Sequence, residues 1–148
     1  MRYIYIYLLF LTFAWCISIL LAPYLKSIND PVNIFIYFWF SKICHQLPER
    51  SFYFCNEKLA VCHRCTAIYF SFFIGVLLYP AVRKIKEKWL YRFFYISIII
   101  IVIDFLFGYI SILQNKITIL ISGTLFGILS SFLIIDALLT INKNKTEN

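Results

Sequence analysis

Four long apolar stretches alternate with shorter polar segments along the chain. They lie at about residues 3–22, 66–82, 91–110 and 117–140 and carry very few charged side chains. An α-helix rises about 1.5 Å per residue, so about twenty residues cross a hydrocarbon core of roughly 30 Å. The pattern therefore predicts an all-α polytopic membrane protein, a bundle of four transmembrane helices.

The first two stretches are separated by a long segment, residues 23–65, which is expected to lie outside the bilayer. Pro23 is expected to end the first helix, because proline cannot continue the hydrogen-bond ladder. Residues 32–40 are apolar and aromatic but too short to span, so they are predicted to form an interfacial or re-entrant helix. We expect one membrane domain over residues 1–148, with residues 23–65 as its largest loop.

The composition agrees with a membrane protein and excludes other classes. Hydrophobic residues make up 62% of the chain and charged residues only 14%, which no ordinary soluble domain matches. The net charge of +7 does not indicate nucleic acid, because the basic residues lie between apolar stretches and form no stripe with aromatics. We therefore expect the lipid bilayer as a partner and no nucleic acid. The chain has no phosphate-binding loop and no Ser-His-Asp arrangement, so nothing supports a hydrolase or a kinase, and whether it is an enzyme stays open.

Lysine and arginine counts predict how the helices are oriented. Residues 1–2, 80–92 and 140–148 hold eight basic residues in 24 positions, whereas 23–65 and 112–116 hold six in 48. Cytoplasmic segments carry the excess of basic residues. Both termini are thus predicted to be cytoplasmic in a multi-pass protein of a prokaryotic cell membrane. The loop 23–65 is then extracytoplasmic, where disulfides persist.

Cysteine and histidine residues gather in this loop. Cys62 and Cys65 lie one helical turn apart, where the second spanning helix is expected to begin. Cys44 and His45 lie earlier in the same loop, seventeen to eighteen residues before Cys62. Three thiolates and one imidazole form a tetrahedral ligand set that favours zinc or another transition metal. We therefore predict a metal site made by these four residues. Two further candidate ligands are Cys55 and His63.

Two other uses of the same cysteines stay open. Cys62 and Cys65 could serve a membrane thiol-disulfide oxidoreductase, because a helix N-terminus lowers the pKa of a thiol; its redox partner is not specified by the sequence. Alternatively, Cys44 could be joined to Cys62 or Cys65 by a purely structural disulfide. Cys16, alone in the first stretch, is expected to act as a small hydrophobic residue.

Two blocks around these cysteines resemble the signature of the domain-of-unknown-function family 2085. The blocks are Cys44-His45-Gln46-Leu47-Pro48-Glu49-Arg50-Ser51-Phe52 and Val61-Cys62-His63-Arg64-Cys65-Thr66-Ala67-Ile68-Tyr69. Asp104, Gly123 and Gly127 match a later part of the pattern, whereas Ala67 stands where a glycine is expected. The resemblance covers roughly residues 40–130. It implies a four-helix membrane protein with a Cys/His block, and it implies no substrate.

Polar residues near the cysteines are expected to support the site. Asp104 lies within a predicted span, where a carboxylate is costly unless it is paired. We expect Asp104 to bridge to Arg64 or Arg50 and so to draw the loop over the helices. The full set of supporting residues is Gln46, Glu49, Arg50, Arg64 and Asp104.

Two glycines in the last apolar stretch have a spacing that favours helix packing. Gly123 and Gly127 lie four residues apart, on one face of a helix. Small residues at this spacing let two helix backbones approach closely. We expect this contact within the bundle or between copies, so a homo-oligomer stays open.

Overall fold

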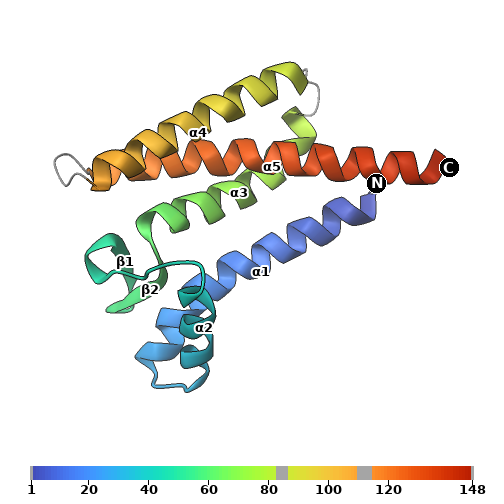
Figure 1. Cartoon of the computed structure of the whole chain (residues 1–148). Coiled ribbons are helices and arrows are strands. Elements are labelled where there is room, and N and C mark those ends of the chain that lie inside the picture. Colours follow the sequence, from blue (N-terminus) through green and yellow to red (C-terminus); the bar gives the residue numbers. More distant parts are fainter. Residues whose placement is uncertain (1, 83–86, 110–114, 148) are drawn as a thin grey trace.

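Four long helices make up most of the protein. The computed structural model describes residues 2–82, 87–109 and 115–147 (Figure 1). The helices are α1 (Arg2–Ser27), α3 (His63–Val82), α4 (Glu87–Tyr109) and α5 (Lys116–Glu147). Each contains a stretch of at least 18 residues that is long and apolar enough to cross a membrane. The predicted all-α fold with four transmembrane helices is confirmed.

Some helix ends differ from the predicted spans. α1 continues through Pro23 to Ser27, so the prediction that this proline ends the helix is wrong. Pro23 is almost completely buried, and the packing of its ring offsets the hydrogen bond that its missing N–H cannot make. α3 begins at His63, earlier than predicted, because its first turn is formed by the cysteine-bearing segment. Residues 83–86 of the basic segment counted at 80–92, and residues 110–114 around the end of the third predicted span, lie outside the described residues.

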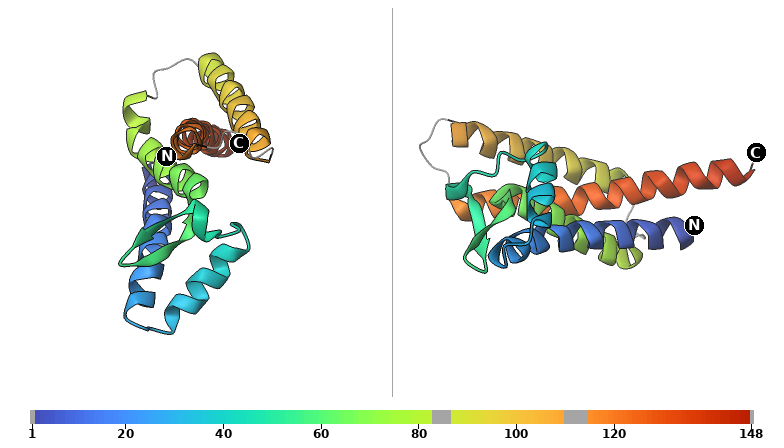
Figure 2. Two further views of the ribbon diagram at one scale, coloured as in Figure 1. Left: turned by 90° about the vertical axis from the view of Figure 1, so that its left-hand side faces the viewer. Right: turned by 90° about the horizontal axis from the view of Figure 1, so that it is seen from below.

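The helices form a curved row with α5 in a central position. α5 packs against both α3 and α4, whereas α1 packs on α3 and makes little contact with α5. The left view of Figure 2 shows this row along the axis of α5. The N- and C-termini lie at the same end of the bundle (Figure 1).

Small residues allow α3 and α5 to touch along their backbones. A Cβ atom added at Gly127 would overlap both the hydroxyl of Ser71 and the carbonyl oxygen of Ile68. A Cβ at Gly123 would lie 3.0 Å from the Cβ of Ala67. The two glycines thus face α3 within the bundle, where the two helix backbones approach closely.

The segment between α1 and α3 folds into a compact cap. It contains α2 (Val32–Ser41), a 3-10 turn η1 (Pro48–Arg50) and the antiparallel strands β1 (Ser51–Phe54) and β2 (Glu57–Cys62). The cap lies at the end of the bundle opposite to the two termini (Figure 1). A helix at about 32–40 was predicted, but the β-hairpin was not.

The second strand of the hairpin is followed directly by α3. Phe54 pairs with Glu57 across a two-residue turn formed by Cys55 and Asn56, whose φ angles are 53° and 61°. Positive φ angles at both central residues are typical of a type I′ turn, whose twist matches that of the two strands of a hairpin. β2 ends at Cys62 and α3 begins at the next residue, so the strand fixes where the first turn of α3 lies.

Candidate metal centre

Three cysteines from different parts of the cap converge on one point. The sulfur atoms of Cys44, Cys62 and Cys65 all lie within 4.8 Å of one another. Cys44 is buried, and the other two are half-buried. A zinc–sulfur bond is about 2.3 Å long, so two sulfurs in a tetrahedral zinc site are about 3.8 Å apart. A contraction of up to about 1 Å in the sulfur separations would therefore let all three sulfurs bind one ion.

Backbone contacts hold Cys44 in this position. The N–H of Cys44 donates to the carbonyl oxygen of Phe40, at 2.9 Å, which continues the hydrogen bonding of α2 by one more turn. The Cys44 side chain then packs in the same buried cluster as Phe40. The N–H of Cys62 donates to the Cys44 sulfur at 3.2 Å. The Cys44 sulfur thus receives a hydrogen bond from the backbone of Cys62, another member of the cluster.

Cys62 immediately precedes the first residue of α3, where free N–H groups stabilise negative charge. Hydrogen bonds from the Cys44 and Cys65 thiols, then from the backbone N–H groups of Cys65 and Arg64, hold the pKa of Cys62 far below its usual range. Burial acts in the opposite direction but is outweighed. The thiolate is the form of cysteine that binds metals and attacks disulfides. All five cysteines are free thiols in the structure, so the disulfide considered from the sequence is not formed.

The other predicted ligands lie apart from the three sulfurs. His45 is exposed although it follows Cys44 directly, and Cys55 is exposed in the hairpin turn. His63 is buried, with its ring edge-on to Phe52 at a centroid distance of 4.3 Å. Within the described part of the chain, the structure brings together three of the four residues predicted as the primary ligand set.

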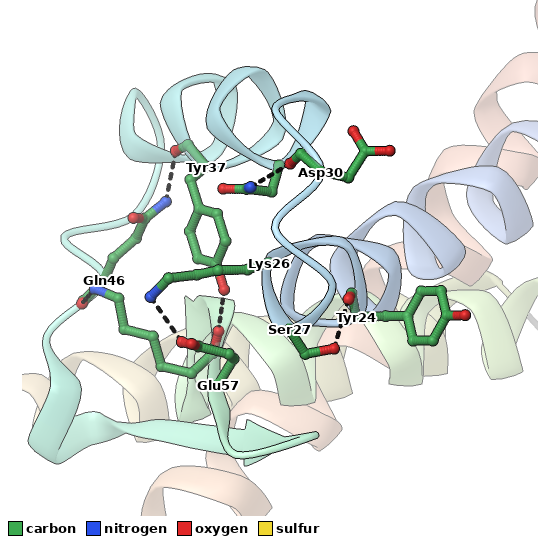
Figure 3. A network of polar contacts seen from close by, with 9 residues as sticks. Tyr24, Lys26, Ser27, Asp30, Tyr37, Gln46 and Glu57 are labelled. Atoms are coloured by element: carbon green, nitrogen blue, oxygen red, sulfur yellow. Dashed lines mark hydrogen bonds and ion pairs between the residues drawn. The ribbon is translucent and has the colours of Figure 1, made fainter.

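A polar network fixes the loop that carries the first of the three cysteines (Figure 3). The Gln46 amide donates to the carbonyl oxygen of Tyr37 at 2.8 Å, and the Lys58 ammonium donates to the carbonyl oxygen of Gln46 at 2.9 Å. The Tyr37 hydroxyl donates to the carbonyl oxygen of Lys58. Lys26 and Glu57 form an ion pair at 2.6 Å beside the Tyr37 side chain. The loop is therefore held between α2 and β2 from both sides.

Tyr37 and Lys58 were not singled out from the sequence. Their hydrogen bonds are accepted by backbone carbonyl groups, which every residue has. The accepting positions therefore need no particular residue type, and no sequence motif indicates these contacts. Burial, with a smaller contribution from Glu57, raises the pKa of Tyr37 to about 12. The hydroxyl therefore stays protonated and able to donate at neutral pH.

An ion pair inside the bundle connects the start of α3 to α4. Arg64, which lies between two of the clustered cysteines, pairs with Asp104, and both side chains are largely buried. The Ser122 hydroxyl of α5 lies 3.3 Å from the same carboxylate and donates to it. Glu49 and Arg50 are exposed in η1, so Arg64 is the residue that bridges to Asp104. Three helices thus meet at one carboxylate.

Comparisons with known proteins agree with the sequence signature. Residues 44–133 match a family described as predicted membrane protein (DUF2085), which confirms the resemblance and includes all three clustered cysteines. An uncharacterized protein of Methanocaldococcus jannaschii is 36% identical over 93 residues, which cover 59% of this chain and 60% of that protein. An uncharacterized protein of Methanothermobacter thermautotrophicus is 46% identical over 44 residues, or 28% of this chain and 40% of that protein. The matches thus span less than two thirds of either relative. No solved structure matches the chain.

Proposed function

The chain belongs to the predicted membrane protein family DUF2085, and we propose that its three-cysteine cluster binds one soft transition-metal ion, with zinc as the first candidate. The observation that carries the proposal is the convergence of Cys44, Cys62 and Cys65 within 4.8 Å. Thiolates select zinc, Cu(I) and iron over calcium and magnesium, which prefer oxygen ligands. The basic-residue counts support an extracytoplasmic position for this centre, which is part of the proposal.

The fourth ligand is part of the proposal. Zinc in proteins is usually tetrahedral. We assign the fourth position to His45, which adjoins Cys44 and whose exposed ring is free to turn toward the sulfurs when the ion binds. His63 is a weaker candidate because its ring is buried against Phe52.

The connectivity of the cluster indicates what a bound ion would do. Cys44 belongs to the loop after α2, whereas Cys62 and Cys65 belong to the junction of β2 and α3. An ion bound to all three links two parts of the cap that are far apart along the chain. Binding to the folded state alone stabilises it by about 2.7 kcal/mol when the free ion is at one hundred times its Kd. The proposed role is to hold the cap closed and to retain the metal at the membrane surface.

Metal analysis of the purified protein tests the proposal. Wild-type protein should retain or take up about one zinc, iron or copper ion per chain. The double variant Cys62→Ser/Cys65→Ser should lose it, whereas Cys55→Ser, which changes an exposed cysteine of the same cap, should keep it. Substituting His45 with alanine should weaken binding without abolishing it. Folded wild-type protein that neither retains nor takes up any of these ions would refute the proposal.

A second candidate function is thiol-disulfide exchange, and the position of Cys62 and Cys65 at the start of α3 favours it. In this reaction the Cys62 thiolate would attack a disulfide of a partner protein and form a mixed disulfide. Cys65 would then displace the partner, which leaves with both of its thiols reduced, while Cys62 and Cys65 become oxidised. Substituting Cys65 with serine should trap the mixed disulfide in cells. Thiols that never change their oxidation state would rule this candidate out.

A further inference from the structure

α2 runs across the long helices and not along them. In the left view of Figure 2, where α5 is seen along its axis, α2 is seen from the side. It lies at the same end of the molecule as the hairpin (Figure 1). Its ten residues extend about 15 Å, roughly half of the hydrocarbon thickness, so α2 does not span a bilayer.

One face of α2 packs on the protein, and the opposite face is bare. Phe40 is only 1% exposed and meets the ring of Trp15 in an edge-to-face contact at 5.2 Å. The opposite face presents four large apolar side chains that are between 58% and 74% exposed. These are Ile34, Phe35, Phe38 and Trp39. A contiguous apolar surface of this kind is unfavourable in water and marks an interaction surface.

This bare face is continuous with the lipid-facing surface of α1. Phe35, Phe38 and Trp39 line an apolar groove of about 590 Å³ whose other wall includes Leu11 and Ala14 of α1. α1 is one of the helices long and apolar enough to cross the membrane. The same apolar medium that surrounds α1 therefore reaches the bare face of α2.

Charged residues at both ends of α2 determine how deeply the helix can lie in the bilayer. Asp30 precedes the helix, and its carboxylate accepts a hydrogen bond from the N–H of Val32 at 2.8 Å. Lys42 follows the helix, with its ammonium 4.5 Å from the centre of the Phe38 ring. A re-entrant helix would carry one end into the hydrocarbon, where a charged group costs at least about 2.5 kcal/mol. Because both ends are charged, both belong at the level of the lipid headgroups.

We propose that α2 is an in-plane membrane anchor that docks its bare face on the phospholipid interface of the leaflet nearest the hairpin. Aromatic side chains such as Trp39 are favoured at this level of a bilayer. The Lys42 ammonium lies over the Phe38 ring, and its long side chain lets it reach the lipid phosphates from there. The anchor does not depend on metal binding, and so it stands or falls separately from the proposed function.

Fluorescence quenching in vesicles tests the anchor. The double variant Trp15→Phe/Trp89→Phe leaves Trp39 as the only tryptophan, and a matched variant that keeps Trp15 alone reports on the spanning helix α1. The vesicles contain phosphatidylcholine with bromine near the carbonyl end or near the methyl end of the acyl chains. We expect carbonyl-end bromine to quench Trp39 at least about twofold more than methyl-end bromine, since the ring belongs at the interface. Stronger quenching by methyl-end bromine would show a re-entrant helix, and quenching by aqueous iodide alone would show a helix in water; either result overturns the proposal.

A second measurement uses the unaltered protein, because the Trp15 substitution removes the contact with Phe40. Phospholipids carrying a photoactivatable diazirine in the headgroup region or at the chain end are incorporated into the vesicles, and labelled peptides are mapped by mass spectrometry. The headgroup probe should label α2 more strongly than the chain-end probe, whereas the chain-end probe should label the middle of α1. Absence of lipid labelling on α2, with α1 labelled, would contradict the anchor.

Discussion

The contact between α3 and α5 leads to a sharp prediction about a single methyl group. Gly127→Ala places a Cβ atom that overlaps the carbonyl oxygen of Ile68 and lies only 3.1 Å from the amide nitrogen of Phe72. Backbone atoms cannot rotate away as a side chain can, so the two helices must move apart. Gly123→Ala is a matched control on the same helix, because its added Cβ would lie 3.0 Å from the Ala67 Cβ and 3.1 Å from the carbonyl oxygen of Arg64, which needs a smaller adjustment than the backbone overlap at Gly127.

The expected magnitudes follow from two opposing effects. Overpacking a tight interior contact costs about 1–3 kcal/mol, whereas replacing glycine by alanine in a helix gains up to about 1 kcal/mol. At Gly127 the overlap is with backbone, so the cost is at the upper end and the net loss is about 1–2 kcal/mol. At Gly123 the two effects nearly cancel, and the net change is expected to be within about 0.5 kcal/mol of zero.

Reversible unfolding in mixed micelles, with increasing amounts of a denaturing detergent and circular dichroism as the signal, measures both values. The free energy of unfolding should fall for Gly127→Ala and stay nearly unchanged for Gly123→Ala. Equal effects of the two substitutions, or a Gly127→Ala protein more stable than wild type, would refute the packing argument.

Three further predictions concern charges and hydroxyl groups. Asp104→Ala leaves Arg64 unpaired in the bundle and should cost about 3–5 kcal/mol, and the double variant Arg64→Met/Asp104→Leu should recover most of this loss in the same unfolding assay. Lys26→Met should cost less than about 1 kcal/mol, because the side chains of its ion pair with Glu57 are 43% and 30% exposed; a larger loss would mean that the pair is better shielded than its exposure indicates. The pKa of Tyr37 is raised from 10.0 to about 12, so the stability that its protonated hydroxyl contributes is complete below pH 10 and is lost as pH rises through about 12. The tyrosinate absorbance of wild type minus Tyr37→Phe should therefore appear only toward pH 12, and its appearance near pH 10 would contradict the buried hydroxyl.

The spanning helices could be predicted from the sequence because hydropathy alone determines them. About twenty consecutive apolar residues have no stable alternative in water, and every backbone group in lipid must be paired within the helix. Helix ends depend on local packing and were less predictable. Pro23 shows this, since its place inside α1 depends on the burial of its ring.

The hairpin of the cap gave only a weak signal. Its turn, Cys55 and Asn56, adopts two positive φ angles without a glycine, whereas the usual signature is Asn-Gly or Asp-Gly. The strand Ser51–Phe54 has the aromatic residues that favour strands, but three of its four side chains are exposed and show no alternation. Asn56, which tolerates positive φ, was the one residue that could have indicated the turn.

The cysteines of the candidate site could be predicted from the sequence, but their arrangement in space could not. The spacing of Cys62 and Cys65 placed two sulfurs together on one helical turn, whereas Cys44 reaches them only because α2 folds back over α1. The exposure of His45 depends on how the chain leaves α2, which no spacing rule describes. Likewise, the choice between Arg64 and Arg50 as the partner of Asp104 required the relative positions of α3 and α4.

X-ray absorption spectroscopy of zinc-loaded protein tests the central claim most directly, because it counts the sulfur atoms around the ion. With a zinc–sulfur distance of about 2.3 Å, wild-type protein should show three sulfurs and one lighter ligand. Cys44→Ser should reduce the count to two, and Cys55→Ser should leave it at three. A shell made only of nitrogen and oxygen, or a sulfur count that Cys44→Ser does not change, would contradict the account.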